Sequence, residues 1–500
     1  MTSYSDDRNR SVIPRWRPFR LASELGETAD SRIQTPPLGE IEGLAARLSD
    51  WRSEKTSVHA ADVFGLALAA GNPLAVREIA ESLAGSTDSM TSLARDLARQ
   101  ALDGVVSPGG VDGTDSAITD FQGGIRCLRQ MLTQDPRDAL SWMDLALSYT
   151  VAGLTEKASS AARVALGLAR HDRFVLRSVA RLLVHQDRPD AAYALLSREP
   201  RSETDPWLMA ATIATARAAG RPPPGRRRAI AMADDEAYSE HHRSELRSAL
   251  GTLEQDAGKV RNARRLYSES LLAPTENAVA QAAWATRRDP QIALFDAGLD
   301  APRSFEARAW TAFQKTQWNE AFLQAARWHQ DQPFSARPAG LASYIASSLL
   351  EDHAGAEAIT RQALRSSPAD FTLRNNLVFA LALQGKVGQA DKEFRKIVFS
   401  GLSPREAVIA KATSGLLSFR QGNSAIGRQA YREAIETAQK MSNDLRLQAM
   451  ALARLAFEEI RAGTEEAGPA KLAALSIEPS LSEAAHDVRA LLKRLRETSR

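Results

Sequence analysis

Few side chains in this sequence have the types and spacing that catalysis or metal binding needs. His241 and His242 are neighbours, and neighbours on a helix point about 100° apart, so both imidazoles cannot face one metal ion. Cys127 is the single cysteine, which excludes an internal disulfide and a thiolate metal cage. Because it lies between Ile125 and Leu128 on a predicted helix, we expect it to be a buried packing thiol rather than a reactive one.

Sequence motifs for catalysis are also missing from the chain. It contains no glycine-rich phosphate loop, no G-x-S-x-G nucleophile elbow and no H-E-x-x-H metal helix. We therefore predict no catalytic, metal or cofactor-binding residue, and we expect that the protein is not an enzyme.

The densest positive charge lies in the segment from Gly220 to Ala229. Its basic loop holds three consecutive arginines, Arg226, Arg227 and Arg228, and the acidic trio Asp234 to Glu236 follows closely. We expect a solvated loop neutralised by that trio, and the alternative is a contact with phosphate or an acidic partner. Nucleic acid binding has little support, because no aromatic residues are interleaved for base stacking and the formal net charge is only +3.

An aromatic and basic motif stands out in the first forty residues, which otherwise indicate a mostly disordered arm. Trp16 and Phe19 are crowded among arginines in the stretch from Ser11 to Leu25, where two prolines disfavour an early helix. Apolar side chains in a flexible arm usually cover a surface. Two interpretations stay open: the arm packs back on its own chain as a cap, or it is a docking motif for a partner.

The rest of the composition favours helices. Ala, Leu, Arg and Glu dominate, and these residues lose little side-chain entropy in a helix. Apolar residues recur at helical spacing from Ile41, with helices predicted over 58–70, 73–83 and 90–102. The Gly, Pro, Ser and Asp content of residues 104–115 indicates the main boundary of the chain.

Beyond that boundary a period near 34 residues appears. Counting from Ala139, the residues at positions 4, 7, 8, 11, 20 and 27 are Trp142, Leu145, Ala146, Tyr149, Ala158 and Ala165. Small residues at positions 8, 20 and 27 allow helices to approach closely, and large ones fill the gaps. The pattern resembles the tetratricopeptide repeat. Further copies begin at Arg173, Ser244, Pro302, Arg337, Phe371 and Val408.

The resemblance implies an all-α, right-handed α-solenoid of tetratricopeptide-like helix pairs. We expect the arm at 1–40, a repeat-like helical region at 41–113, the repeat solenoid at 114–479, and a C-terminal capping helix and tail at 480–500. Two departures interrupt the repeat: the RPPPGRRRA stretch, and a shortened pair at 278–299 in which Pro290 is expected to start a helix.

In this family the concave surface is formed mainly by the first helix of each pair, and it binds proteins or peptides. Its register positions nominate as partner-binding residues Met143, Asp144, Leu147, Asn375, Asn376 and Phe379. Asn376 matches an asparagine that contacts peptide backbone in some members, but Asp144 and Ala307 occupy that position in other repeats, so a continuous asparagine ladder is absent. We expect Asn375 to be an ordinary polar surface residue.

The resulting hypothesis is a non-enzymatic scaffold or adaptor that binds a protein or peptide partner. The alternative is a regulatory sensor whose solenoid changes curvature on binding a peptide or a nucleic-acid-associated complex. The N-terminus lacks the apolar core of a secretory signal, and no apolar run of about 18 residues follows. A cytoplasmic protein without a membrane partner is therefore expected, and the high Arg, Ala and Gly content suggests a bacterial source.

Overall fold

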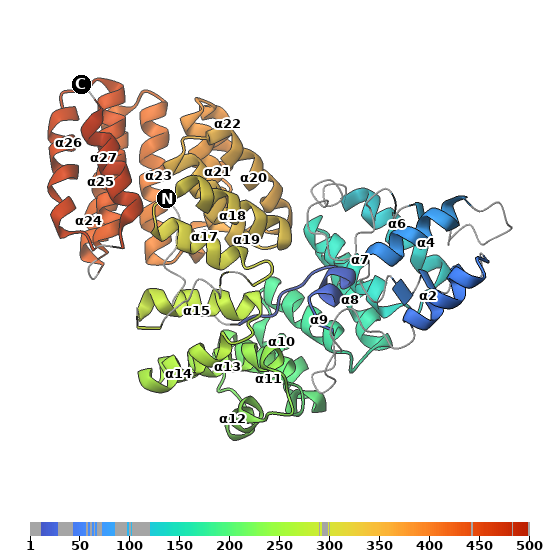
Figure 1. The fold of residues 1–500 in the computed structure, drawn as a ribbon. Helices are drawn as coiled ribbons and strands as arrows, with labels where there is room; N and C mark the ends of the chain where they lie inside the picture. Colours follow the sequence, from blue (N-terminus) through green and yellow to red (C-terminus); the bar gives the residue numbers. More distant parts are fainter. Residues whose placement is uncertain are drawn as a thin grey trace. The chain divides into compact units, whose positions relative to one another are not determined.

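A computed structural model describes residues 12–28, 44–56, 59–60, 63–64, 66–67, 73–85, 98–99, 102, 121–289, 291–292, 299, 301–441, 444–482 and 484–498. The chain divides into two compact units, a larger one of residues 1–31 and 123–500 and a smaller one of residues 32–122. Every regular element among the described residues is a helix (Figure 1).

The smaller unit is described in part. It contains α2 (Leu44–Ser53) and α4 (Pro73–Gly85), whose apolar side chains pack around Trp51, Phe64 and Ile79. The predicted helix over 58–70 is helical wherever it is described. Most of the predicted helix over 90–102, and the whole of the boundary loop at 104–115, lie outside the described residues.

In the larger unit, helices follow one another in pairs, with short irregular turns between some of them. The helices before residue 300 are α6 (Phe121–Gln134), α7 (Ala139–Val151), α8 (Thr155–Leu168), α9 (Arg173–His185), α10 (Pro189–Ser197), η2 (Pro200–Glu203), α11 (Pro206–Ala218), α12 (Arg226–Asp234), α13 (Glu240–Asp256), α14 (Val260–Ser270) and α15 (Glu276–Arg288). Those after it are α17 (Phe305–Gln314), α18 (Trp318–Asp331), α19 (Ala336–Tyr344), η3 (Ile345–Leu349), α20 (His353–Ser366), α21 (Phe371–Leu383), α22 (Val387–Phe394), η4 (Phe399–Gly401), α23 (Pro404–Arg420), α24 (Ser424–Lys440), α25 (Leu445–Ala462), α26 (Ala467–Ser476), η5 (Glu478–Ser480) and α27 (His486–Glu497).

The repeat register accounts for how these pairs pack. The alanines at the small-residue positions, Ala146, Ala158 and Ala165, are fully buried where α7 meets α8. In α21, Leu377 and Leu381 are buried at the positions predicted for large residues. The expected all-α solenoid of tetratricopeptide-like pairs is therefore confirmed. Pro290, which is expected to start a helix, lies outside the described residues, and residues 291–292 after it form a turn.

Side-chain caps set where many of the first helices begin. Asp138, Asp172, Asp205 and Asp370 each accept hydrogen bonds from backbone N–H groups in the first turn of the helix that follows. Ser403 and its partner Glu406 form a capping box at the start of α23. These contacts satisfy backbone donors that have no partner inside the helix, which is why the repeats begin at these residues.

The stretch from α7 to α20 turns back on itself, because α20 contacts α7. Gly153, in the turn after α7, has φ +74°, and a Cβ atom added there would lie 2.1 Å from the carbonyl oxygen of Arg365. The aromatic rings of His185 and Phe334 also meet, with centroids 5.3 Å apart. The first helices of this stretch therefore surround an interior.

The last helix, α27, contacts both α25 and η3. Its Asp487 accepts a hydrogen bond from the hydroxyl of Tyr344 at 2.5 Å, and Arg494 donates to the carbonyl oxygen of Ser348. The helix starts later than residue 480, after the short turn η5. It thus covers the end of the solenoid and also reaches back to η3. No helix among the described residues is long and apolar enough to cross a membrane.

Candidate functional site

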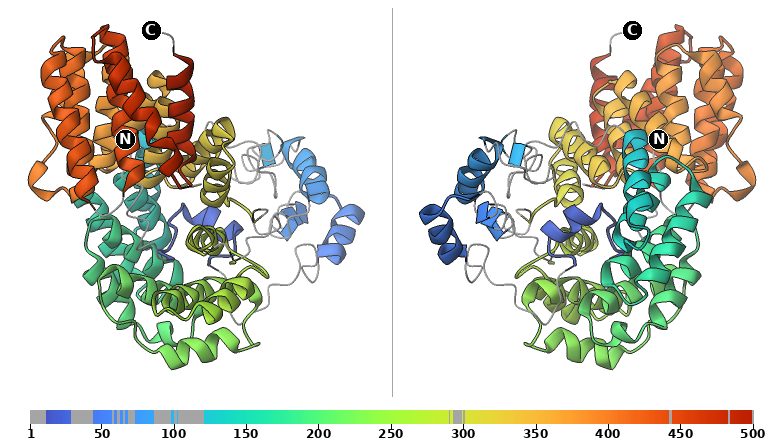
Figure 2. Two further views of the ribbon diagram at one scale, coloured as in Figure 1. Left: turned by 90° about the vertical axis from the view of Figure 1, so that its left-hand side faces the viewer. Right: turned by 90° about the vertical axis from the view of Figure 1, so that its right-hand side faces the viewer.

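Residues 12–28 lie in the interior of the larger unit, inside the curve that the helices from α7 to α18 form in both views of Figure 2. The segment is extended up to Pro18 and then forms the short helix α1 (Phe19–Glu24). Val12 packs in the apolar cluster around Met209 and Leu246, and the ring of Phe19 lies 5.3 Å from that of Phe174. We call residues 12–20 the internal segment.

Side chains of the solenoid hold the backbone of the internal segment. Gln332 contacts both backbone groups of Trp16, accepting from its N–H at 3.5 Å and donating to its carbonyl oxygen at 3.3 Å. Asn277 donates to the carbonyl oxygen of Ile13 at 3.0 Å. Asp144 accepts from the N–H of Phe19 at 2.8 Å. These contacts depend on the peptide backbone and not on the side chains that it carries.

Trp16 is the apolar anchor of the internal segment. Its side chain is 0% exposed, and its ring centroid lies 5.5 Å from that of Phe334. The guanidinium of Arg181 also stacks on Phe334, with its Cζ 4.7 Å from the ring centroid. Burial and the nearby cations Arg15 and Arg337 lower the pKa of Arg181 to about 9.

Arg17, the next residue, is also 0% exposed and is surrounded by carboxylates. It forms a two-point contact with Asp331, at 2.9 Å from both Nε and Nη2. Nη2 also donates to Glu276 at 2.7 Å and Nη1 to Glu27 at 2.5 Å. Such bidentate, charge-assisted bonds are stronger and more directional than neutral ones.

The charges in this cluster set its proton balance. Burial would lower the pKa of Arg17, but Asp331, Glu276 and Glu27 raise it well above its usual value. Burial would raise the pKa of Asp331, but Arg17 holds it below its usual value. Glu27 shows the opposite balance. Burial raises its pKa to about 7, although the positive charge of Arg17 acts to lower it.

Of the predicted concave residues near the internal segment, Asp144 contacts it directly. Burial raises the pKa of Asp144 to about 7, although the N–H of Phe19 acts in the opposite direction. Met143 and Leu147 are buried. They pack within the solenoid and present little surface to a partner.

The second group of predicted residues lies on α21. Asn375 is fully buried and accepts a hydrogen bond from the hydroxyl of Thr413 at 2.8 Å, so the expectation of a polar surface residue was wrong. Asn376 donates to the carbonyl oxygen of Gly340 at 3.1 Å and to Ser343 Oγ at 2.9 Å. Both amides therefore bind the neighbouring helices. Phe379 lines a cavity in the C-terminal half of the unit.

The basic loop residues form the start of α12 and are exposed. Arg226 pairs with Glu254 of α13, and Arg228 pairs with Glu203 of η2 at 2.6 Å. The expected neutralisation by the acidic trio is thus replaced, for these two arginines, by carboxylates from neighbouring elements. For Arg227, both the solvated loop and the contact with phosphate or an acidic partner stay predictions.

Cys127, the metal-ligating residue types and His242 are the other candidates for chemistry. Cys127 is exposed, so the expectation of a buried packing thiol was wrong. Over the described part of the chain, no group of three His, Cys, Asp or Glu side chains could hold a metal ion. Nδ1 of His242 lies 2.7 Å from the hydroxyl oxygen of Ser239, which also caps α13.

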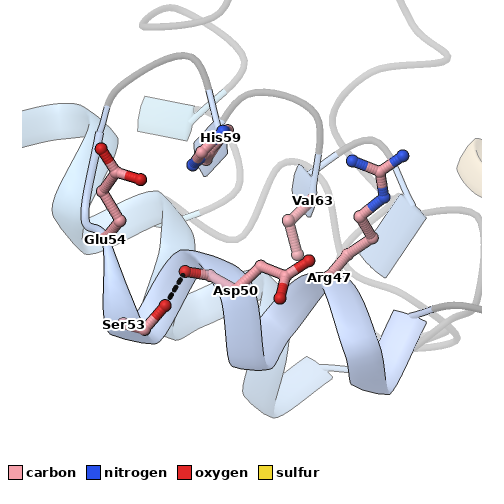
Figure 3. Close-up of a pocket in the computed structure, with 6 residues that line it drawn as sticks. All are labelled: Arg47, Asp50, Ser53, Glu54, His59 and Val63. Carbon is pink, nitrogen blue, oxygen red and sulfur yellow. Dashed lines mark hydrogen bonds between the residues drawn. The ribbon is translucent and has the colours of Figure 1, made fainter.

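A hollow of about 240 Å³ lies in the smaller unit (Figure 3). It is lined by Arg47, Asp50, Ser53, Glu54, His59 and Val63. A serine, a histidine and carboxylates are residue types that nucleophilic sites use. However, the Ser53 hydroxyl donates to the carbonyl oxygen of Asp50 at 2.7 Å, which engages it within its own helix. The hollow thus does not assemble a nucleophile with its base.

No family model matches this chain, and no curated protein matches it. Similar solved structures include the APC/C hetero-tetramer Cut9–Hcn1, with TM-score 0.37 and 13% identity over 90% of this chain and 92% of that one. Yeast Tom70 has TM-score 0.30 and 11% identity over 89% and 96%. The human IFIT1 dimer with m7Gppp-AAAA has TM-score 0.31 and 14% identity over 73% and 96%. Because these TM-scores are low, the fold assignment rests on the helix pairs described above.

Sequence reasoning singled out Trp16, Phe19 and Asp144 but missed the residues that recognise the internal segment. Asn277, Glu276, Asp331 and Gln332 are polar residues at helix ends, where such residues are common for capping. A signal was present in the segment itself, because three arginines alternate with its aromatic residues.

Proposed function

We propose that this protein is a non-enzymatic, peptide-binding scaffold that recognises an extended segment in the interior of its larger unit. One observation carries the proposal: the solenoid holds residues 12–20 through their backbone, with Gln332 bonded to both the N–H and the carbonyl of Trp16. Side chains that bind backbone groups recognise an extended peptide, and pockets for individual side chains supply the selectivity.

The partner segment is defined by the two buried anchors. Trp16 needs an apolar space beside Phe334. Arg17 needs the carboxylates of Glu276 and Asp331, which the solenoid supplies. The third carboxylate, Glu27, comes from the N-terminal segment itself. A few buried aromatic and arginine anchors usually carry most of the binding energy of an interface. The scaffold therefore selects extended peptides with an aromatic residue followed by arginine, and its own internal segment competes with them.

The test uses the whole chain, folded with its internal segment in place. A protease site inserted between residues 29 and 43 allows the segment to be cut after folding. A labelled peptide of residues 11–28 in excess should then exchange into the interior, measured by fluorescence anisotropy. The same peptide with Trp16→Ala and Arg17→Ala is the control and should not exchange. If the cut segment never exchanges, it is a fixed part of the core and the proposal fails.

A second candidate function is a sensor whose curvature changes on binding, and the closure of the solenoid favours it. The turn at Gly153 lies against Arg365 where α7 and α20 meet, so a change in the curvature of this stretch on peptide binding would shift that contact. A change in small-angle X-ray scattering on cutting and removing the segment is expected. An unchanged profile would contradict this second candidate and leave the scaffold proposal standing.

A further inference from the structure

A separate cavity of about 320 Å³ lies in the C-terminal half of the larger unit. Its walls come from α21, α23 and α25, which are first helices of their pairs, and from η3, α20, α24 and α27. The volume falls near the lower end of the range of about 300–1,000 Å³ that is typical of small-molecule sites. The cavity is therefore large enough for a small ligand.

Arg454, on α25, lines this cavity and is only 9% exposed. Its Nε and Nη2 atoms are buried and have no hydrogen-bond partner among the described residues. The face of its guanidinium stacks on Phe379, with Cζ 4.6 Å from the ring centroid. Two buried N–H groups without a hydrogen-bond partner are costly, because they have lost their hydration without gaining equivalent bonds.

The carboxylates nearby are engaged by other arginines. Glu458, one turn along α25, binds Arg420 through both oxygens at 2.6 and 2.8 Å, and also binds Arg461 at 3.2 Å. Glu351 pairs with Arg494 at 2.5 Å. The four arginines and two glutamates that line the cavity leave it with an excess of positive charge.

The protonation state of a neighbouring histidine is consistent with this excess of positive charge. His353 also lines the cavity, and burial together with the field of Arg454 and Arg420 lowers its pKa, although Glu351 and Asp352 act in the opposite direction. The imidazole is consequently neutral near pH 7 and leaves the excess unchanged.

The rest of the lining is mainly apolar. Leu383, Leu416, Phe457 and Ile460 contribute to it together with Phe379. A free inorganic anion would satisfy Arg454 but would leave this apolar surface without a partner. A ligand with one anionic end and an apolar body satisfies both parts.

We propose that this cavity binds a small organic carboxylate, with the carboxylate attracted to the guanidinium of Arg454 and an aromatic or branched aliphatic body against Phe379 and Leu416. The site is separate from the internal segment and does not rest on the scaffold proposal. Arginine keeps its positive charge when it is buried, so the guanidinium of Arg454 can attract a carboxylate that enters the cavity.

The experiment titrates 3-phenylpropionate into the full-length protein and follows binding by calorimetry. The neutral amide of the same acid and inorganic phosphate are the comparison probes. We expect 3-phenylpropionate to bind at least about tenfold more tightly than either, because the positive charge of the cavity favours the carboxylate and the apolar walls favour the body. Equal binding of the amide, stronger binding of phosphate, or no binding of 3-phenylpropionate would overturn the proposal.

Substitutions test where 3-phenylpropionate binds. Arg454→Met should abolish it, whereas Arg432→Met, which changes an exposed arginine on α24, should leave it unchanged. If Arg454→Met fails to fold, Ile460→Trp provides a second approach, because the larger side chain fills the cavity while Arg454 stays in place. Unchanged binding in a folded Arg454→Met or Ile460→Trp protein would show that the ligand binds elsewhere and overturn the assignment.

Discussion

Two buried arginines of the larger unit show opposite solutions to the same physical problem. Arg17 is fully buried and is bound by Asp331, Glu276 and Glu27. Arg454 is almost as buried, but two of its nitrogen atoms have no partner among the described residues. Burying a charge is costly unless it is paired. In the first region the chain supplies the pairing and fixes its own segment, whereas in the second it leaves the pairing to a ligand.

The strongest test of this contrast replaces Arg17, the arginine that is paired. Arg17→Met removes the buried cation that Asp331, Glu276 and Glu27 share, which should lower the free energy of unfolding of the larger unit by about 3–5 kcal/mol. Urea denaturation followed by tryptophan fluorescence measures it. Arg20→Met is the matched control, because Arg20 is exposed and pairs with Glu24 one turn away; a change below about 0.5 kcal/mol is expected. Equal effects of the two variants would show that the carboxylate cluster does not stabilise the fold.

The next effect concerns the closure around the internal segment. Gly153→Ala introduces a Cβ atom against the carbonyl oxygen of Arg365 at a residue with φ +74°, and should cost about 2–4 kcal/mol. Gly385→Ala has φ +75° but no atom within 4 Å of the added Cβ, so it reports the backbone cost alone, about 1–2 kcal/mol. The same denaturation curves compare them. If Gly153→Ala costs no more than Gly385→Ala, the contact between α7 and α20 is not closely packed.

The repeat pairs were predictable because their cause is local. Small residues such as Ala146 and Ala158 are needed wherever two helices cross closely, so they recur with the period of the repeat. The register also placed the start of α7 at Ala139 and that of α21 at Phe371. Sequence alone thus supplied the fold class and the first helices of the pairs.

The partners of Arg17 were not predictable, because their cause is not local. Glu276 and Asp331 lie 259 and 314 residues away and belong to different repeats. They meet Arg17 only because the solenoid curves around the internal segment. The prediction for Asn375 was wrong for a related reason. The register assigns Asn375 to a first helix, but its hydrogen-bond partner Thr413 belongs to the next repeat.

A smaller effect follows from the proton balance around Arg17. The pKa of Glu27 is about 7 in the folded chain and 4.5 ordinarily. Between these pH values the folded chain holds a proton that the unfolded chain has lost. The stability from Glu27 is therefore full below about pH 4.5 and is lost as the pH rises through about 7.

Glu27→Gln isolates this contribution, because glutamine resembles the protonated carboxyl. From pH 5 to pH 8 the free energy of unfolding of Glu27→Gln should rise relative to wild type by on the order of 2 kcal/mol. The buried His185 and His329, whose pKa values burial lowers to about 4, titrate alike in both proteins and cancel. A difference that stays constant with pH would mean that Glu27 is ionised throughout.

The smallest change is expected at the unpaired arginine. Arg454→Met removes a buried charge and puts an apolar side chain of similar length against Phe379, so no carboxylate is left without its cation. The free energy of unfolding should stay within about 1 kcal/mol of wild type or increase. The same substitution removes binding of 3-phenylpropionate if the cavity is a carboxylate site. A loss of stability as large as that of Arg17→Met would instead show that Arg454 stabilises the fold, and the contrast between the two regions would disappear.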